Sequence, residues 1–247
     1  MSRSLHTLPN RHDLEQIHRR MANGVVIDVL RASTTAAVAL MNGARAIYPC
    51  AEIEEARQLR NELNRQGQSA LLCGERDGYV IDGFDLGNSP LEYTPPRIGG
   101  RVLILATTNG TRALKATRQI LSGLVCLGGM INAQAVARKL IKSEDDILLV
   151  CSGKEEFFAL EDFVGAGMII DEVLQLDPSE KWILDDASKA ALVLYNFHRS
   201  DLLEMLRNSA HGKYLSECGF TNDLPICAQT NTCESVPTYR DTVLISS

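Results

Sequence analysis

Apolar segments of strand length alternate with helix-forming segments along most of this chain, and this alternation limits the folds open to it. The pattern predicts strands at 24–30, 45–50, 69–73, 101–107, 123–128 and 145–153. It predicts helices at 35–43, 51–66, 109–120, 131–141, 159–174 and within 182–219. Such alternation is typical of α/β proteins, in which helices cover both faces of a largely parallel sheet. A last strand, 242–246, is expected at a sheet edge.

One long segment, 74–100, interrupts the alternation. It holds six glycines and three prolines, and also Tyr79, Ile81 and Phe84. A loop of this length inside a domain is usually functional or disordered. Its aromatic and aliphatic side chains favour an ordered loop that packs on the protein. The best candidate boundary is TPPRIGG at the end of this loop, but a chain of 247 residues suits one domain, and we predict a single domain over 1–247.

Charge and composition argue against several classes of protein. The 25 Lys and Arg residues are outnumbered by 31 Asp and Glu residues, and a net charge of −6 argues against a nucleic-acid surface. No apolar run approaches the roughly 20 residues that span a bilayer, and the N-terminal segment lacks the apolar core of a secretory signal. Seven cysteines without a CxxC pair favour reduced, mostly buried thiols. We therefore expect a cytoplasmic protein without nucleic-acid or membrane partners.

Polar side chains gather just after the predicted strands. Ligands of open parallel sheets bind at the carboxyl ends of the strands, so residues there are candidates for a binding site. The candidates are Arg31, Ser33, Thr34, Thr35, Arg76, Asn88, Ser89, Thr108, Asn109, Gly110, Thr111, Arg112, Ser152 and Gly153.

Two of these segments, one beginning near Arg31 and one ending at Arg112, lead from a strand into a helix through hydroxyl-bearing residues. A helix N-terminus offers free N–H groups and positive potential, and arginine can bind an oxyanion with two hydrogen bonds. Helix capping explains either segment alone. Two such segments at equivalent positions favour a site for a phosphate group.

Four acidic residues, Asp28, Glu75, Glu161 and Asp162, complete the candidate site. Asp28 lies within an apolar strand, where a carboxylate is costly unless it is paired or bound to metal. One interpretation is that the four carboxylates hold Mg²⁺ together with phosphate oxygens of a substrate. The alternatives are an ion pair between Asp28 and Arg31, and ordinary helix-dipole contacts for Glu161 and Asp162.

Motifs of several common phosphate-handling classes are missing. The chain contains no Walker A sequence, no DxD motif beginning at Asp28, and no GxGxxG between a strand and a helix. Three other segments, VVIDVLRASTTAAVALMNGA, GERDGYVIDGFDLGNSP and ATTNGTRAL, resemble the 2-phosphosulfolactate phosphatase family of coenzyme M biosynthesis. LEDFVGAGMIID and FTNDLPICAQTNTCESVP are similar to further segments of that family, so the resemblance runs from about residue 20 to the end.

The resemblance implies a three-layer α/β/α fold peculiar to the family and a Mg²⁺-dependent phosphatase. Its substrate would be the small anion (2R)-2-phospho-3-sulfolactate, or a related phosphorylated α-hydroxy acid, and its products 3-sulfolactate and phosphate. Asp28, Glu75 and Asp162 would act in catalysis, and the protein would be a homodimer. Direct attack by water and a covalent intermediate on Asp28 both stay open. Two other functions also stay open: a non-catalytic phospho-anion sensor, and a phosphotransferase that uses the 74–100 loop for a second substrate.

Overall fold

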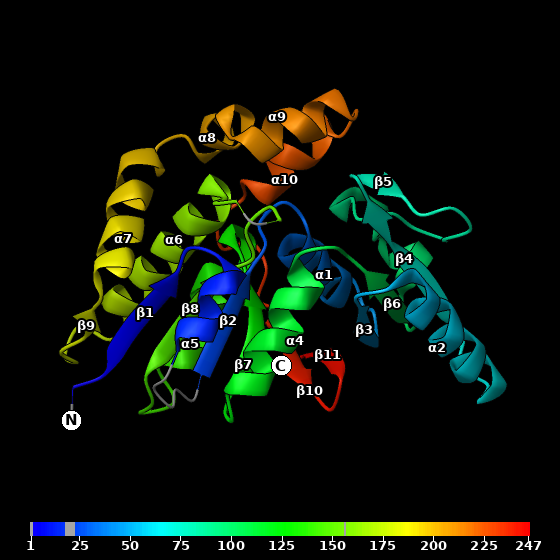
Figure 1. The fold of residues 1–247 in the computed structure, drawn as a ribbon, viewed down its shortest axis with the longest axis horizontal. Helices are drawn as coiled ribbons and strands as arrows, with labels where there is room; N and C mark the ends of the chain where they lie inside the picture. The colour runs from blue at the N-terminus through cyan, green and yellow to red at the C-terminus, as the bar shows by residue number, and fades with distance from the viewer. Residues whose placement is uncertain (1, 18–22, 156) are drawn as a thin grey trace.

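The computed structural model describes residues 2–17, 23–155 and 157–247. Within these residues one eleven-stranded mixed sheet is covered by helices (Figure 1). The strands are β1 (Ser4–Leu8), β2 (Asn23–Ile27), β3 (Ala46–Cys50), β4 (Ala70–Arg76), β5 (Tyr79–Val80), β6 (Val102–Ala106), β7 (Val125–Gly128), β8 (Ile147–Cys151), β9 (Ile183–Leu184), β10 (Pro237–Arg240) and β11 (Val243–Ser246). The α-helices are α1 (Ala32–Met41), α2 (Ile53–Arg65), α3 (Pro95–Ile98), α4 (Gly110–Ile120), α5 (Ala133–Leu140), α6 (Leu160–Leu176), α7 (Asp186–His198), α8 (Leu202–Asn208), α9 (Ala210–Glu217) and α10 (Leu224–Cys227). Short 3₁₀ turns are η1 (Arg11–Gln16), η2 (Pro90–Glu92), η3 (Met130–Asn132) and η4 (Thr221–Asp223).

Two groups of parallel strands make up most of the sheet. The strand order is β5-β4-β6-β3-β11-β10-β7-β2-β8-β1-β9. Strands β7, β2, β8, β1 and β9 form one parallel group, and β3, β6 and β4 form the other. The antiparallel hairpin β10–β11 joins them, since β10 pairs with β7 and β11 pairs with β3.

The expected edge position of the last strand is therefore wrong. Strand β11 lies inside the sheet, and Leu244 is 1% exposed and pairs with Ile47 of β3. The error has a physical cause: β10 begins with Pro237 and carries mostly polar residues, so it shows no strand pattern of its own. Without a visible hairpin partner, a short terminal strand is naturally assigned to an edge.

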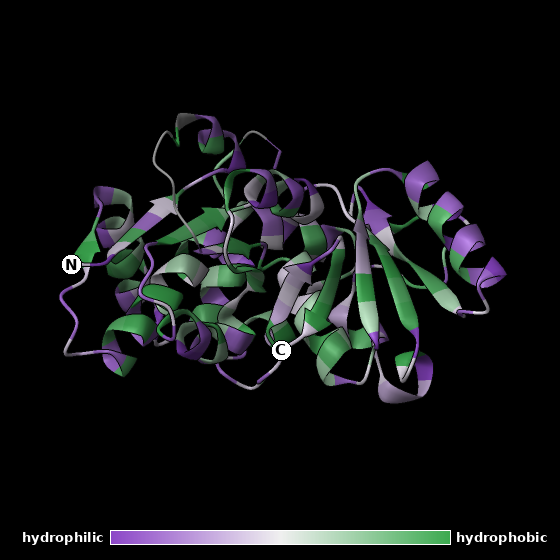
Figure 2. Cartoon of the chain, turned by 90° about the horizontal axis from the view of Figure 1, so that it is seen from below, coloured by the Kyte–Doolittle hydropathy of each residue, from purple (hydrophilic) through white to green (hydrophobic). Residues whose placement is uncertain are grey.

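Alternate residues of the central strands pack against opposite helical layers. Val25 and Ile27 of β2 belong to a core with α5 and α6, whereas Val26 belongs to a core with α1 and α4. A third apolar cluster lies between α2 and the β4–β6 part of the sheet. Figure 2 shows mostly hydrophobic strands, and a largely hydrophilic α2 at one end of the molecule. The predicted three-layer α/β/α architecture is confirmed.

The segment at 74–100 is ordered and packs on the protein, as expected. Tyr93 is 1% exposed, and its hydroxyl donates to the carbonyl of Gly87 at 2.6 Å. The hydroxyl of Thr35 in α1 donates to the carbonyl of Asn88 at 2.8 Å. The first bond lies within the loop, and the second fastens the loop to the helix that follows β2.

The region at 182–219 contains α7, α8, α9 and the short strand β9, rather than helix alone. Helices α8, α9 and α10 cross the top of the molecule in Figure 1, over one end of the central strands. Across the described ranges, no helix combines the length and apolarity needed to cross a membrane.

Candidate active site

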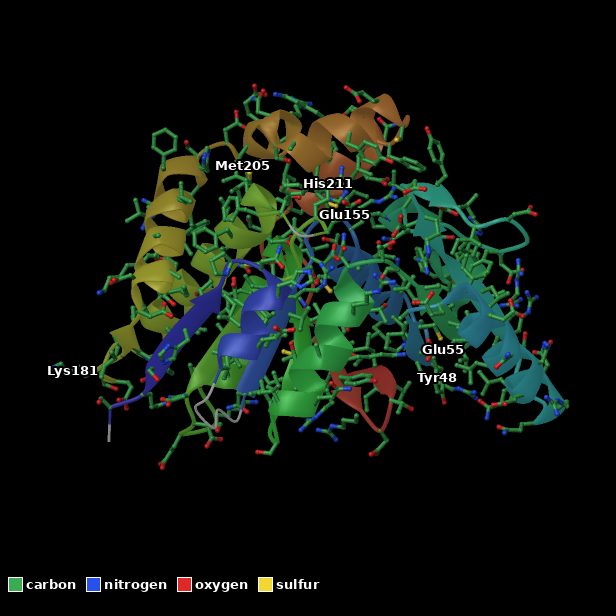
Figure 3. All side chains as sticks on the ribbon, in the orientation of Figure 1. Tyr48, Glu55, Glu155, Lys181, Met205 and His211 are labelled. Carbon is green, nitrogen blue, oxygen red and sulfur yellow. The ribbon has the colours of Figure 1, made fainter. Side chains whose placement is uncertain are left out.

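An open pocket of about 190 Å³ lies where β2, β4, β6 and β8 end, with α9 at its rim. It is lined by Asp28, Leu30, Arg31, Glu75, Asp77, Gly78, Asn88, Thr107, Thr108, Asn109, Lys154, Glu155, His211, Tyr214 and Leu215. Figure 3 labels two of these, His211 on α9 and Glu155 on the segment that follows β8. The expected convergence of strand ends is confirmed, because segments far apart in the chain share one pocket.

Asp28 lies between the starts of two helices. Its Oδ1 accepts the N–H of Ala32 at 3.2 Å, in the first turn of α1. A Cβ added at Gly110, the first residue of α4, would lie 2.8 Å from Oδ2 of Asp28. Glycine therefore leaves room for the carboxylate at the α4 N-terminus, where the positive end of the helix dipole favours an anion.

Burial raises the pKa of Asp28 above its usual value, because the residue is only 8% exposed and its carboxylate loses hydration. The positive charge of His211 and the N–H of Ala32 oppose this rise, whereas the charges of Glu75 and Glu161 add to it. An acidic side chain in this setting gains from any cation or positive potential brought into the pocket.

Neither helix uses the side chain of its N-cap residue as a cap. The N-cap residues are Arg31 for α1 and Asn109 for α4, and neither makes a side-chain capping bond. Asn109 Oδ1 instead accepts from Nη1 of Arg11 and from the N–H of Glu155, both at 3.3 Å. Asn109 thus joins three segments at the pocket edge.

The hydroxyls after β2 bond to backbone and are not among the pocket-lining groups. Ser33 Oγ accepts from the N–H of Asp28 at 3.0 Å, and Thr34 Oγ1 donates to the carbonyl of Val29 at 2.9 Å. Thr35 holds the 74–100 loop, as described above. These three residues shape the segment that carries Asp28, and their predicted contact with substrate stays a prediction.

The predicted arginines differ in position. Arg31 lines the pocket, but its guanidinium binds the carboxylate of Asp223 at 2.7 Å and the carbonyl of Gly78 at 2.9 Å. Arg76 bonds to carbonyl oxygens, and Arg112 forms a surface ion pair with Glu52 at 3.2 Å. Arg76 and Arg112 lie outside the pocket lining because nearby acceptors hold their guanidinium groups elsewhere. Their expected role in binding phosphate stays a prediction.

Other candidates lie around the pocket rather than on its wall. Ser89 donates to Asp223 at 2.6 Å. Ser152 is fully buried, and its Oγ has no hydrogen-bond partner among the described residues. Gly110, Thr111 and Gly153 belong to lining segments without forming the wall themselves, whereas Thr108, Asn109 and Asn88 do line it.

The remaining acidic residues have defined partners. Glu75 lines the pocket and accepts from the N–H groups of Thr108 at 3.3 Å and Gly78 at 3.0 Å. Asp162 lies behind the pocket and accepts from Val29 at 2.8 Å and Gly153 at 3.2 Å. Burial, reinforced by the charges of Asp28 and Glu161, holds the pKa of Asp162 well above its usual value.

Glu161 contacts a residue that the sequence analysis did not select. Its Oε1 lies 3.2 Å from Nδ1 of His211, which lines the pocket. Lys154, Glu155 and Tyr214 also line the pocket without having been selected. His211 and Tyr214 stand on α9, far from any strand end in the sequence, and reach the pocket only because α9 folds over it. Lys154 was recognisable, since it directly follows Gly153 after a predicted strand.

The expected Mg²⁺ site can be compared with the donors in this region. In the part of the chain that the structure describes, no group of three or more Asp, Glu, His or Cys side chains is arranged to hold a metal ion. Mg²⁺, however, is usually held by one or two carboxylates, with waters and substrate phosphates as its other ligands. Asn88 Oδ1 is buried at the pocket without a hydrogen-bond partner among described residues. A carboxylate at Asp28 and an unpartnered amide oxygen at Asn88 fit such an ion, and the four-carboxylate assignment stays a prediction.

Known proteins similar to this chain point to one family. The family model for 2-phosphosulpholactate phosphatase matches residues 7–242. The chain is 39% identical over 225 residues to a probable 2-phosphosulfolactate phosphatase of Caldanaerobacter subterraneus subsp. tengcongensis, covering 91% of this chain and 90% of that protein. It is 41% identical over 225 residues to a protein of the same description from Caldicellulosiruptor saccharolyticus, covering 89% and 90%. It is 38% identical over 221 residues to another from Thermotoga maritima, covering 90% of each chain. The chain therefore belongs to the 2-phosphosulpholactate phosphatase family.

Proposed function

We propose that this protein hydrolyses the phosphate ester of 2-phospho-3-sulfolactate, or of a related phosphorylated α-hydroxy acid, with Mg²⁺ as cofactor. Family membership supports the reaction class. The observation that carries the proposal is the place of Asp28, a buried carboxylate packed against the glycine that begins α4. A carboxylate beside a helix N-terminus combines the two features that phosphoryl chemistry needs: a ligand for a cation, and donors for phosphate oxygens.

The start of α4 binds the phosphate in this proposal. The first-turn N–H groups of a helix lack acceptors within the helix, and α4 begins at Gly110, which packs against the carboxylate of Asp28. Thr108 and Asn109 line the same part of the pocket. These groups orient the phosphate so that its ester oxygen points toward the open side.

Asp28 and Asn88 would hold the Mg²⁺ ion, whose chemistry when bound is to neutralise charge on the phosphate. Glu75 ties Thr108 to the turn at Gly78, and so fixes the pocket wall. Asp162 holds the backbone on both sides of the pocket through Val29 and Gly153. In this proposal Asp162 positions other groups, and its predicted part in catalysis stays a prediction.

His211 lines the same pocket as Asp28, and its ring would donate a hydrogen bond to the phosphate. The neighbouring carboxylate of Glu161 orients its ring, as carboxylates do for imidazoles in many active sites. This pair stabilises the negative charge that gathers on the phosphate and on the departing alkoxide.

The first experiment is phosphate release from a panel of phosphorylated α-hydroxy acids, 2-phospho-3-sulfolactate included, in Mg²⁺ and in EDTA. Release that depends on Mg²⁺ supports the proposal. Ligand-induced stabilisation without release from any ester would instead support a non-catalytic anion-binding protein.

A second measurement separates direct attack by water from a covalent intermediate on Asp28. A burst of alcohol release before steady state, of about one equivalent per site, indicates a phosphorylated enzyme that hydrolyses slowly. Linear release without a burst favours direct attack, or a covalent intermediate that hydrolyses faster than it forms. The stereochemical course at phosphorus distinguishes these two, because one in-line displacement inverts the configuration and two displacements retain it.

We also infer a cytoplasmic location and a homodimer. All seven cysteines are free thiols, which agrees with a reducing compartment. Light scattering coupled to size-exclusion chromatography measures the oligomeric state directly.

A further inference from the structure

One lysine of the pocket wall, Lys154, has no role in the proposed binding of phosphate. Lys154 follows β8, and its Nζ lies 3.8 Å from the centroid of the Tyr214 ring on α9. Both residues line the pocket. The ammonium group thus rests on an aromatic face, which attracts a cation without neutralising its charge.

Lys154 is the available cation of the pocket wall. The other permanent cation there, Arg31, is held by Asp223 at 2.7 Å with both side chains 2% exposed. Among the described residues, Lys154 forms no ion pair with a carboxylate. A lysine that binds no protein anion and faces a pocket is free to bind the anion of a ligand.

The backbone that carries Lys154 is firmly held. Its N–H donates to the carbonyl of Phe157 at 3.0 Å, and its carbonyl accepts from the N–H of Phe157 at 2.9 Å. The preceding Gly153 has φ +68°, and a Cβ there would lie 2.3 Å from the side-chain nitrogen of Asn10. Arg11 also donates to the carbonyl of Ser152 at 3.0 Å. These contacts hold the backbone of Lys154 beside the pocket.

Lys154 reaches the pocket from the segment after β8 and rests against Tyr214 of α9. The proposed phosphate site lies instead beside Asp28, at the starts of α1 and α4. A cation placed away from the phosphate end suits a second anionic group on the same small molecule. The α-hydroxy acid esters of the proposed function carry such a group, either a carboxylate or a sulfonate.

We propose that Lys154, supported by the ring of Tyr214, binds the acid group of the substrate and so determines its specificity. This inference rests on the proposed function, because it assigns the second anion of that substrate. Lysine provides a compact charge with rotatable donors, which can serve either a carboxylate or a sulfonate.

The test compares four phosphate esters of one three-carbon skeleton. Besides the phosphate, isopropyl phosphate has no acid group, 2-phospholactate has a carboxylate, and 2-phosphooxypropane-1-sulfonate has a sulfonate. 2-Phospho-3-sulfolactate has both a carboxylate and a sulfonate. For Lys154→Met, we expect KM to rise by about 10-fold or more, the scale of one charged hydrogen bond, for esters bearing the recognised acid group. We expect kcat to change little, and values for isopropyl phosphate to stay at those of the unaltered protein. Whichever single-acid ester shows the rise identifies the group bound.

Matched variants separate charge from structure. Lys154→Arg should restore most of the lost affinity, and Tyr214→Phe, which keeps the ring, should bind better than Tyr214→Leu. Lys213→Met removes an exposed lysine of α9, the helix that carries Tyr214, and should leave every KM unchanged. An equal loss for all four esters, or no loss for any, would overturn the inference.

Failure of the proposed function is detected separately. If the unaltered protein hydrolyses none of the esters, calorimetric binding of 3-sulfolactate and of 2-phospholactate still tests Lys154. Weaker binding to Lys154→Met than to Lys213→Met supports the inference even then. Equal affinity of these two variants, or no binding to the unaltered protein, contradicts it.

Discussion

Arg31 and Asp223 form an ion pair of 2.7 Å in which both side chains are 2% exposed. Arg31 is the N-cap residue of α1, and Asp223 precedes α10 near the other end of the chain. The guanidinium also binds the carbonyl of Gly78, and Asp223 accepts from Ser89, so the pair connects three segments around the pocket. The ring of Phe220 lies 4.3 Å from the guanidinium carbon and covers it.

Removal of one partner should therefore destabilise the fold. Asp223→Ala leaves a buried guanidinium unpaired, and we expect a loss of about 3–5 kcal/mol in the free energy of unfolding. Urea denaturation measures it. As a control, Glu52→Ala breaks the exposed pair with Arg112 and should change stability by about 0.5 kcal/mol or less. Similar losses for the two variants would show that the buried pair has no special role.

Space beside Asp28 should matter for activity. Gly110→Ala places a methyl group 2.8 Å from Oδ2 of Asp28 and 2.9 Å from the Cβ of Ala32. Since the carboxylate must move, we expect kcat/KM to fall by about 10-fold or more, which is roughly 1.4 kcal/mol of transition-state stabilisation. Gly129→Ala is the control, because its nearest new contacts are 3.8 Å away. Normal kinetics for Gly110→Ala would mean that the position of Asp28 is not critical.

The charge of Asp28 should be costly for the fold but necessary for turnover. Its pKa is raised mainly by burial from an ordinary value of 3.8. Between that value and the raised pKa, the folded protein binds more protons than the unfolded chain, so stability falls as pH rises. Asp28→Asn removes this contribution.

In EDTA, we therefore expect the Tm of Asp28→Asn to equal that of the unaltered protein below about pH 4 and to exceed it increasingly at higher pH. Its kcat should fall by on the order of 10³-fold, because the cation ligand is lost. A Tm difference that shrinks with rising pH would contradict the assigned shift. Near-normal kcat would show that Asp28 is not catalytic.

Buried thiols should resist labelling in the native protein. Cys218 is partly exposed and the other six cysteines are buried. Burial also raises the pKa of Cys73 and of Cys126 to about 12, which lowers the fraction of reactive thiolate. A disulfide reagent should label one thiol per chain quickly in buffer and seven in denaturant. Cys218→Ser should abolish the fast phase; its persistence would place another thiol at the surface.

The α/β architecture and the position of Asp28 in the pocket were predictable, because both leave local signals in the sequence. The run GVVIDVL predicts a buried strand, and a lone carboxylate in that run indicates an unusual environment. β2 is fully buried, and Asp28 lies at its end in the pocket. The spacing of apolar residues in the sequence predicts the strands and helices correctly, because it reflects which side chains are buried on the two faces of the sheet.

Side-chain direction and distant contacts were not predictable in the same way. Arg76 and Arg112 stand near strand ends, yet local acceptors hold them outside the pocket. His211 carries no signal, because only the path of α9 over the strand ends brings it near Asp28. Such positions depend on tertiary packing, which adjacency in the sequence does not encode.

The hairpin β10–β11 sits in the middle of the sheet but comes last along the chain. Both parallel groups are synthesised before the two strands that connect them, so each half must persist for a time with an unpaired edge at β7 or β3. Such edges are sites where chains pair wrongly with one another. Completion of the sheet is thus a late, long-range event of folding, because the hairpin that covers both edges follows every other strand of the sheet in sequence.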